Sequence, residues 1–146
     1  MKQNENDIQQ VCFIRMGAVG DLLVATAALE ETLLRFPNAK VWVAGPDLWK
    51  QILLPSRWPR INGILATDRK GLSQMCVPNL QNESWDAQGE VQPIKVFLKQ
   101  CGASINLRLE SLRFAWPSFF ARVPVRIGTC WWGLKWLYTH WSPWLG

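Results

Sequence analysis

The segment from Arg15 to Asp21, RMGAVGD, holds the residues whose types and spacing favour chemistry. It follows the apolar run VCFIR at 11–15 and precedes a periodic stretch, an order that indicates a strand, a glycine loop and a helix. In a parallel sheet the ligand crevice lies at the carboxyl ends of the strands, so we expect this loop to face it. Gly17 and Gly20 would permit backbone torsions and a close ligand approach that a side chain forbids.

Asp21 has two competing interpretations. Aspartate is a preferred helix N-cap, and Asp21 stands where the periodic stretch begins, so the residues alone favour a cap. A carboxylate at the mouth of the crevice would instead accept a proton from a sugar hydroxyl while that hydroxyl attacks an activated carbon. The positive end of the helix dipole favours the ionised carboxylate. Both interpretations stay open on this evidence.

Cofactor and metal chemistry find little support in the sequence. The dinucleotide fingerprint GxGxxG is not met, because Arg15 occupies the position of its first glycine, so a dinucleotide-dependent oxidoreductase is retained only as an alternative. The cysteines are separated by 64, 25 and 29 residues and fit no zinc-ligand spacing; they are Cys12, Cys76, Cys101 and Cys130. We therefore expect buried thiols, no metal and no resident cofactor.

The elements that would position the loop alternate between strands and helices. Apolar residues recur at intervals of 3, 4, 4 and 3 and predict a helix over 21–36 with one buried face, formed by Leu22, Ala25, Leu29, Leu33 and Phe36. Strands predicted at 11–15 and 41–45 flank this helix. A strand, a helix and a second strand within this length form a βαβ unit, which implies a parallel sheet with a right-handed connection.

Less regular patterns predict the other elements. They are helices at 47–54, 94–100 and 110–123, strands at 61–66, 103–107 and 125–128, a polar surface loop at 70–92, and a tail without a clear period. Gly102 would close the second of these helices, and Pro117 would kink or delay the third. The alternation predicts an α/β fold, a Rossmann-like parallel sheet with flanking helices. We assign residues 1–10 to a polar extension and 11–146 to one Rossmann-like domain.

Composition and charge narrow the function classes. Hydrophobic residues make up 49% of the 146 residues and charged residues 18%, which excludes a disordered chain. No apolar run reaches the roughly 18 residues of a membrane-spanning helix, and the polar start carries no targeting signal, so we expect a cytoplasmic protein. Residues 95–146 hold 7 Lys/Arg against one Glu, and five of the ten tryptophans fall in the last 16 positions.

This basic, tryptophan-rich end predicts an anionic partner. The cations are spaced singly and match no nucleic-acid-binding signature, so we expect no nucleic acid. An anionic lipid or glycan surface suits tryptophan with Lys/Arg, which adds peripheral contact with the inner face of the inner membrane to the cytoplasmic expectation.

The opening segment VCFIRMGAVGDLLVATAALEETLLRFPNAKVWVAG resembles the start of glycosyltransferase family 9, the lipopolysaccharide heptosyltransferases, whose pattern runs close to I-x-R-x-G-A-x-G-D-x-L-x-A-T-P-A-L. The segments INLRLESLRFAWPSFFARVPVRIG (105–128) and LYTH (137–140) resemble later landmarks of the family, in the expected order. Two positions differ: Ala27 replaces a usual proline, and Asn106 stands where the fourth strand often ends in aspartate.

The resemblance implies the acceptor-side, N-terminal half of a two-domain GT-B-type glycosyltransferase. Such an enzyme transfers heptose or a related sugar from a nucleotide-sugar donor to an anionic, lipid-linked, lipopolysaccharide-type acceptor. The donor is held mainly by a second half, for which this sequence shows no pattern, so we expect the chain alone to be an incomplete enzyme. The rival is a noncatalytic Rossmann-like domain that binds a nucleotide or a partner.

The resemblance also implies roles for single residues. Asp21 falls on the aspartate of the family's GD pair, the proposed catalytic base, which reverses the preference for a cap. The substrate-binding residues it implies are Gly17, Ala18, Gly20, Arg69, Lys70, Arg113 and Arg126. For the four basic residues the alternatives are a solvated turn at 69–70 and surface charges at 113 and 126. His140, the sole histidine, is expected to pack rather than to react.

Overall fold

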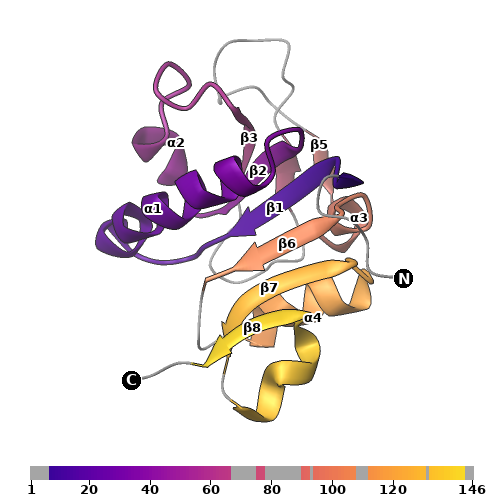
Figure 1. Ribbon diagram of the computed structural model, residues 1–146. Coiled ribbons are helices and arrows are strands. Elements are labelled where there is room, and N and C mark those ends of the chain that lie inside the picture. Colours follow the sequence, from indigo (N-terminus) through magenta and orange to yellow (C-terminus); the bar gives the residue numbers. More distant parts are fainter. Residues whose placement is uncertain are drawn as a thin grey trace.

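The computed structural model describes residues 7–66, 75–77, 90–92, 94–107, 112–130 and 132–143 (Figure 1). The strands are β1 (Gln10–Ile14), β2 (Lys40–Gly45), β3 (Ile61–Ala66), β4 (Met75–Val77), β5 (Glu90–Gln92), β6 (Ala103–Asn106), β7 (Val125–Cys130) and β8 (His140–Pro143). The helices are α1 (Val19–Arg35), α2 (Trp49–Ile52), α3 (Ile94–Leu98), α4 (Leu112–Phe120) and the 3-10 helix η2 (Trp132–Leu137).

The strands form one sheet in the order β5-β4-β3-β2-β1-β6-β7-β8. Six neighbouring strands, β3, β2, β1, β6, β7 and β8, are parallel. When these six are numbered by their place in the chain, their order across the sheet is 3-2-1-4-5-6, the order of a Rossmann sheet. β4 and β5 extend the β3 edge in the antiparallel sense. The predicted fold class, a Rossmann-like parallel sheet with flanking helices, is therefore confirmed, with an antiparallel addition at one edge.

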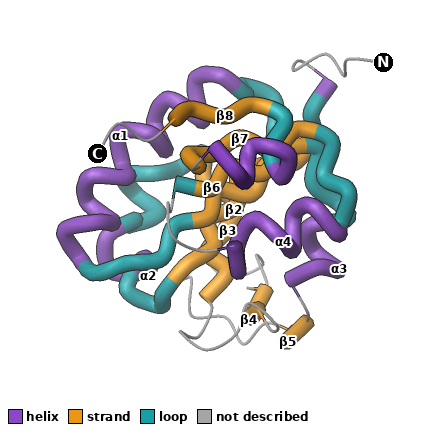
Figure 2. Tube along the Cα trace, turned by 90° about the horizontal axis from the view of Figure 1, so that it is seen from below, coloured by secondary structure: helices purple, strands orange, loops and turns teal. Residues whose placement is uncertain are grey.

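Alternate residues of each strand face two separate apolar layers. Val11 and Phe13 of β1 face the layer under α1 and α2, whereas Cys12 and Ile14 face the layer under α3. Figure 2 shows α1 and α2 on one side of the sheet and α3 and α4 on the other. Because both faces are covered, the central strands are buried almost throughout, as a parallel sheet requires.

The predicted apolar face of the first helix is confirmed. Leu22, Ala25, Leu29 and Leu33 are buried in α1, and Phe36 is buried where the helix ends. The helix begins at Val19, two residues before the predicted start, and ends at Arg35, before the turn that contains Pro37. α1 thus crosses the sheet with its first turn at the end of β1, where the glycine loop lies.

Three sequence predictions were wrong in part. The stretch 70–92, predicted as a loop, contains β4 and β5, because strands of three residues are too short to show an alternating pattern. The tail without a clear period forms η2 and β8, since a 3-10 turn lacks the 3.6-residue period and β8 is a four-residue edge strand. α4 includes Pro117 and runs only from Leu112 to Phe120.

Candidate functional site

The carboxyl end of β1 is the natural place for a ligand in this sheet. The chain leaves β1 for β2 on one side, while β6 lies on the other, so the strand order reverses between β1 and β6. Ligands of open α/β sheets bind at such a switch point. Arg15, the residue after β1, spans it: its Nη1 donates to the Leu107 carbonyl at 3.0 Å, just beyond β6.

Arg15 and the first turn of α1 hold the Asp21 carboxylate from two sides. Arg15 Nη2 lies 3.2 Å from Asp21 Oδ1. The Ala18 N–H donates to Asp21 Oδ2 at 3.2 Å. The Asp21 side chain is 54% exposed, whereas that of Arg15 is 19% exposed. Each carboxylate oxygen has a second lone pair, so a carboxylate oriented in this way can still accept a proton from a solvent-side hydroxyl.

The prediction that Asp21 stands at the N-cap position was wrong. The N-cap of α1 is Ala18, and Asp21 is the third helical residue, which reaches back to the Ala18 N–H. This contact is one half of a capping box; the other half needs an N-cap side chain that accepts a hydrogen bond, and alanine has none. Asp21 therefore stabilises the start of α1 from inside the helix, and the same contact orients its carboxylate.

The two glycines of the loop differ in their surroundings. None of the described glycines has a positive φ, so Gly17 and Gly20 do not use the left-handed torsions that glycine permits. Gly17 lies directly against the Asp21 carboxylate. A β-carbon at Gly20 would meet nothing within 4 Å, and Ala18 is exposed. The face of the loop at Gly20 is therefore open to a ligand.

The first turns of α1 also carry an apolar surface beside Asp21. Val19 is 48% exposed, Leu23 54% and Val24 79%. Val19 and Leu23 are four residues apart, so they lie on the same side of the helix. A polar carboxylate next to exposed aliphatic side chains suits a ligand, or a second protein surface, that offers both hydroxyl groups and apolar groups.

The basic residues predicted for the acceptor are not gathered around Asp21 in the part of the chain that the structure describes. Arg69 and Lys70 lie outside the described residues, as does the side chain of Arg113, whose backbone belongs to α4. Arg126 is the second residue of β7, and its Nη1 donates to the Val123 carbonyl at 2.7 Å, before that strand begins. Its guanidinium thus points away from the carboxyl end of the sheet, where Asp21 lies.

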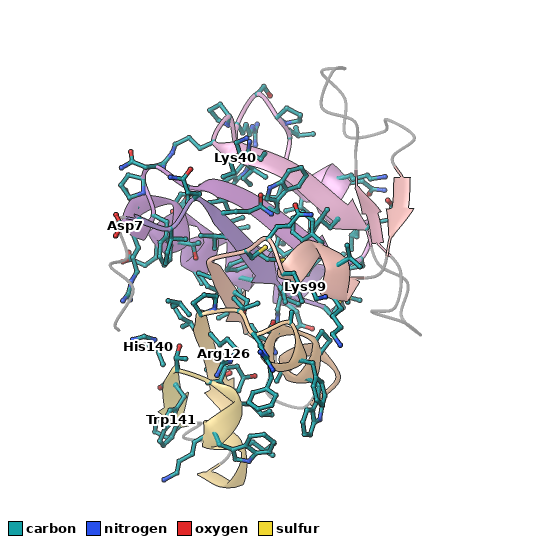
Figure 3. All side chains as sticks on the ribbon, turned by 90° about the vertical axis from the view of Figure 1, so that its right-hand side faces the viewer. Asp7, Lys40, Lys99, Arg126, His140 and Trp141 are labelled. Atoms are coloured by element: carbon teal, nitrogen blue, oxygen red, sulfur yellow. The ribbon has the colours of Figure 1, made fainter. Side chains whose placement is uncertain are left out.

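His140 differs from its prediction. It is exposed at the start of β8 (Figure 3), and its Nδ1 lies 3.0 Å from Thr139 Oγ1. The expectation of a packed histidine was therefore wrong. None of the interactions that the structure describes for Arg15 and Asp21 involves His140.

Two features of the site were missed in the sequence. The role of Arg15 had a signal, its place immediately before the glycine loop. The second feature is a hydrogen bond from buried Asn106 Nδ2, at the end of β6, to Tyr138 Oη at 3.2 Å. A β-carbon at Gly128 would lie 2.3 Å from Tyr138 Cε1, so glycine at 128 lets the phenol reach Asn106. Burial raises the pKa of Tyr138, the Asn106 hydrogen bond lowers it, and the nearby Cys130 thiol raises it.

The described residues contain no group of three His, Cys, Asp or Glu side chains that could hold a metal ion. Among the helices that the structure describes, none is long and apolar enough to cross a membrane.

Comparison with known proteins supports the fold. A solved structure described as the crystal structure of the glycosyl transferase family 9 from Veillonella parvula DSM 2008 is similar to 97% of this chain, with a TM-score of 0.59 and 14% sequence identity. This chain spans 37% of that chain's length. No family model and no curated protein matches the sequence. The chain therefore has a glycosyltransferase-like fold.

Proposed function

We propose that this chain is the acceptor-binding half of a glycosyltransferase resembling family 9, which transfers heptose or a related sugar from a nucleotide-sugar donor to a lipopolysaccharide-type acceptor. The observation that carries the proposal is the oriented, half-exposed carboxylate of Asp21 at the switch point between β1 and β6. The sequence pattern around Arg15 and Asp21 supports it, as does the glycosyltransferase-like fold.

In the proposed reaction an acceptor hydroxyl donates its proton to Asp21 as its oxygen attacks the anomeric carbon of the donor. The bond between that carbon and the nucleotide diphosphate breaks, and the diphosphate leaves with the electron pair. Arg15 keeps the Asp21 carboxylate in place through the 3.2 Å ion pair, and the hydrogen bond to the Leu107 carbonyl holds Arg15 itself. A positioned general base of this kind contributes about 100- to 10,000-fold in rate.

In this proposal a second half of the enzyme binds the nucleotide-sugar donor. Transfer needs both substrates in near-attack geometry, an effect that can be worth roughly 7 to 11 kcal/mol of barrier. The similar structure is longer than this chain, which spans 37% of it. We therefore assign acceptor recognition and the base to the 146-residue chain, and donor binding to a partner half. The proposed place of action is the cytoplasm.

A noncatalytic binding domain is the second candidate, and one contact favours it. The bond from the Ala18 N–H to Asp21 explains an aspartate at position 21 through helix stability alone. On this alternative the exposed loop around Gly20 would bind a nucleotide or a partner without chemistry.

A nuclear magnetic resonance titration of the 146-residue chain tests the proposal. We expect a delipidated lipopolysaccharide-core oligosaccharide to shift the amide signals of Gly17, Ala18 and Asp21, and an ADP-sugar to shift them much less. Asp21→Asn should keep the binding and the folded spectrum. NAD shifting these signals in place of the oligosaccharide, or no response to the oligosaccharide at all, would overturn the proposal.

A further inference from the structure

Four aromatic rings form a cluster between α4 and η2. Trp116 stacks on Phe120 with 5.2 Å between ring centroids, and Trp136 meets Trp116 edge to face at 5.4 Å. Phe119 joins them, 5.3 Å from Trp136. The cluster is nevertheless open to solvent, because Phe120 is 56% exposed and Trp136 is 50% exposed. These exposed rings are an apolar surface that the described residues leave uncovered.

Basic side chains lie directly on these rings. Lys95 Nζ, from α3, is 5.7 Å from the centroid of Phe120. The Arg126 guanidinium is 5.5 Å from the centroid of Phe119. Arg122, the second residue after α4, is exposed and has a φ of 57°. We call these seven residues the aromatic-basic patch: Lys95, Trp116, Phe119, Phe120, Arg122, Arg126 and Trp136.

No carboxylate offsets the positive charge of the aromatic-basic patch in the neighbouring sequence that the structure describes. The stretches 94–107, 112–130 and 132–143, which carry the whole patch, contain no aspartate or glutamate. Lys99 and Lys135, on the same stretches, are exposed and add to the charge. A surface with one sign of charge attracts an extended surface of the opposite sign.

The patch also contains a hollow of about 470 Å3 lined by Phe119, Phe120, Arg122 and Arg126. Two backbone carbonyls fix the Arg126 side chain. Its Nε donates to the Leu137 carbonyl at 2.7 Å, and its Nη1 donates to the Val123 carbonyl at 2.7 Å. A hollow lined by two arginines and two phenylalanines matches a phosphate that is attached to an apolar group.

We propose that the aromatic-basic patch docks this protein on an anionic phospholipid bilayer, with Phe120 and Trp136 in the interface and Lys95, Arg122 and Arg126 on lipid phosphates. Half-exposed aromatic side chains combined with cations, and free of carboxylates, are the composition of membrane-interface surfaces. A protein partner of matched charge would need an equally large acidic surface, whereas an anionic bilayer supplies one directly. Two helical elements, α4 and η2, present the aromatic rings of the patch.

This inference does not rest on the proposed function. The patch shares no residue with the Arg15–Asp21 site, and Arg126 points away from it. A docked chain would therefore leave the carboxyl end of β1 accessible. Failure to bind an oligosaccharide at Asp21 and failure to bind vesicles through Phe120 and Arg122 are separate results.

The test is co-sedimentation of the 146-residue chain with vesicles of phosphatidylcholine alone and of phosphatidylcholine with phosphatidylglycerol. We expect binding to the anionic vesicles only, weakened by salt. Each cation near an anionic bilayer is worth about fivefold in affinity, so Lys95→Glu with Arg122→Glu should weaken binding at least about 25-fold. Phe120→Ser with Trp136→Ser should also weaken it, because the interfacial rings are lost.

The matched control carries the same charge change on another part of the surface. Lys40→Glu with Arg57→Glu replaces two exposed cations outside the patch, and Lys40 belongs to β2, which β1 and β6 separate from the strand that carries Arg126 (Figure 3). This variant should bind the anionic vesicles far better than the patch variant, with circular dichroism showing that both are folded. Equal losses in the two variants would overturn the proposal, because net charge alone would then explain binding.

Three other results would also overturn it. The first is equal binding to phosphatidylcholine vesicles. The second is release of the chain by millimolar inorganic phosphate at constant ionic strength, which would mean that the hollow takes the free anion. The third is absence of vesicle binding together with a change of mass in light scattering that only the patch variants lose, which would make the patch an interface between copies of this chain.

Discussion

A β-carbon at Gly17 would lie 2.6 Å from Oδ2 of Asp21 and 2.7 Å from its Cβ. The two residues therefore depend on each other: the carboxylate can occupy its place between Arg15 and the Ala18 N–H only because position 17 has no side chain. Gly20, in the same loop, has no such neighbour within 4 Å. The glycines of this loop thus serve different purposes, one for the position of a carboxylate and the other for an open surface.

Gly17→Ala should displace the Asp21 carboxylate and destabilise the protein, since overpacking typically costs about 1 to 3 kcal/mol. Gly20→Ala should leave stability equal or higher, because alanine exceeds glycine in helix propensity by roughly 1 kcal/mol. On the proposed function Gly20→Ala should nevertheless weaken acceptor binding, since its methyl group enters the open face. Urea unfolding and acceptor titration of both variants measure this contrast. Equal destabilisation by the two changes would contradict it.

Arg15→Met should lower the melting temperature by about 3 °C. The substitution removes the hydrogen bond to the Leu107 carbonyl and the ion pair with Asp21, and a half-exposed pair adds little, so we expect a loss near 1 kcal/mol in total. Calorimetry of Arg57→Met, which removes an exposed arginine elsewhere, is the control. An unchanged melting temperature for Arg15→Met would show that Arg15 does not join the ends of β1 and β6.

The sequence predicted the central architecture because long, strictly periodic signals carry it. The apolar face of α1 is of this kind, and short continuous apolar runs mark the buried strands around it. Short elements escaped prediction: β4 and β5 have three residues each, and η2 has no helical period. The local sequence preference of such segments for a helix or a strand is too weak to predict, so pairing with the rest of the sheet decides their structure.

The site was predicted less completely than the fold. The loop RMGAVGD located Asp21, but not its ion pair, because the contact between Arg15 and Asp21 depends on the path of the intervening loop. Arg126 could not be separated from the site by its sequence, since the direction of a strand side chain follows from register and neighbouring carbonyls. Predictions for Arg69 and Lys70 lie outside the described residues.

Asp21→Asn should abolish sugar transfer in a polypeptide that contains both halves, with a rate loss of about 100- to 10,000-fold. Asparagine keeps an oxygen that can accept from the Ala18 N–H, so the start of α1 should stay folded. Turnover measured under donor saturation, together with circular dichroism, separates the base from the structural role. Near-normal turnover of the variant would leave Asp21 with the structural role alone.

The phenol of Tyr138 predicts how stability depends on alkaline pH. Burial is the largest influence and raises its pKa, so in the folded protein the phenol keeps its proton at a pH where the unfolded chain, with a tyrosine pKa near 10, has lost it. The unfolded state then binds fewer protons than the folded state, and stability must fall as pH rises through and above about 10. Below that pH the contribution is fully present.

Tyr138→Phe removes this dependence. At pH 8 the variant should be less stable by about 1 kcal/mol, because the hydrogen bond from buried Asn106 to the phenol is lost. Its deficit relative to the original protein should shrink as the pH is raised toward about 11, since only the original protein has a partly buried phenol to ionise on unfolding. Tyr138 is the sole tyrosine, so tyrosinate absorbance follows this group directly in the folded chain. A tyrosinate titration at or below the value of free tyrosine, with a deficit independent of pH, would contradict the partial burial of the phenol and its hydrogen bond to Asn106.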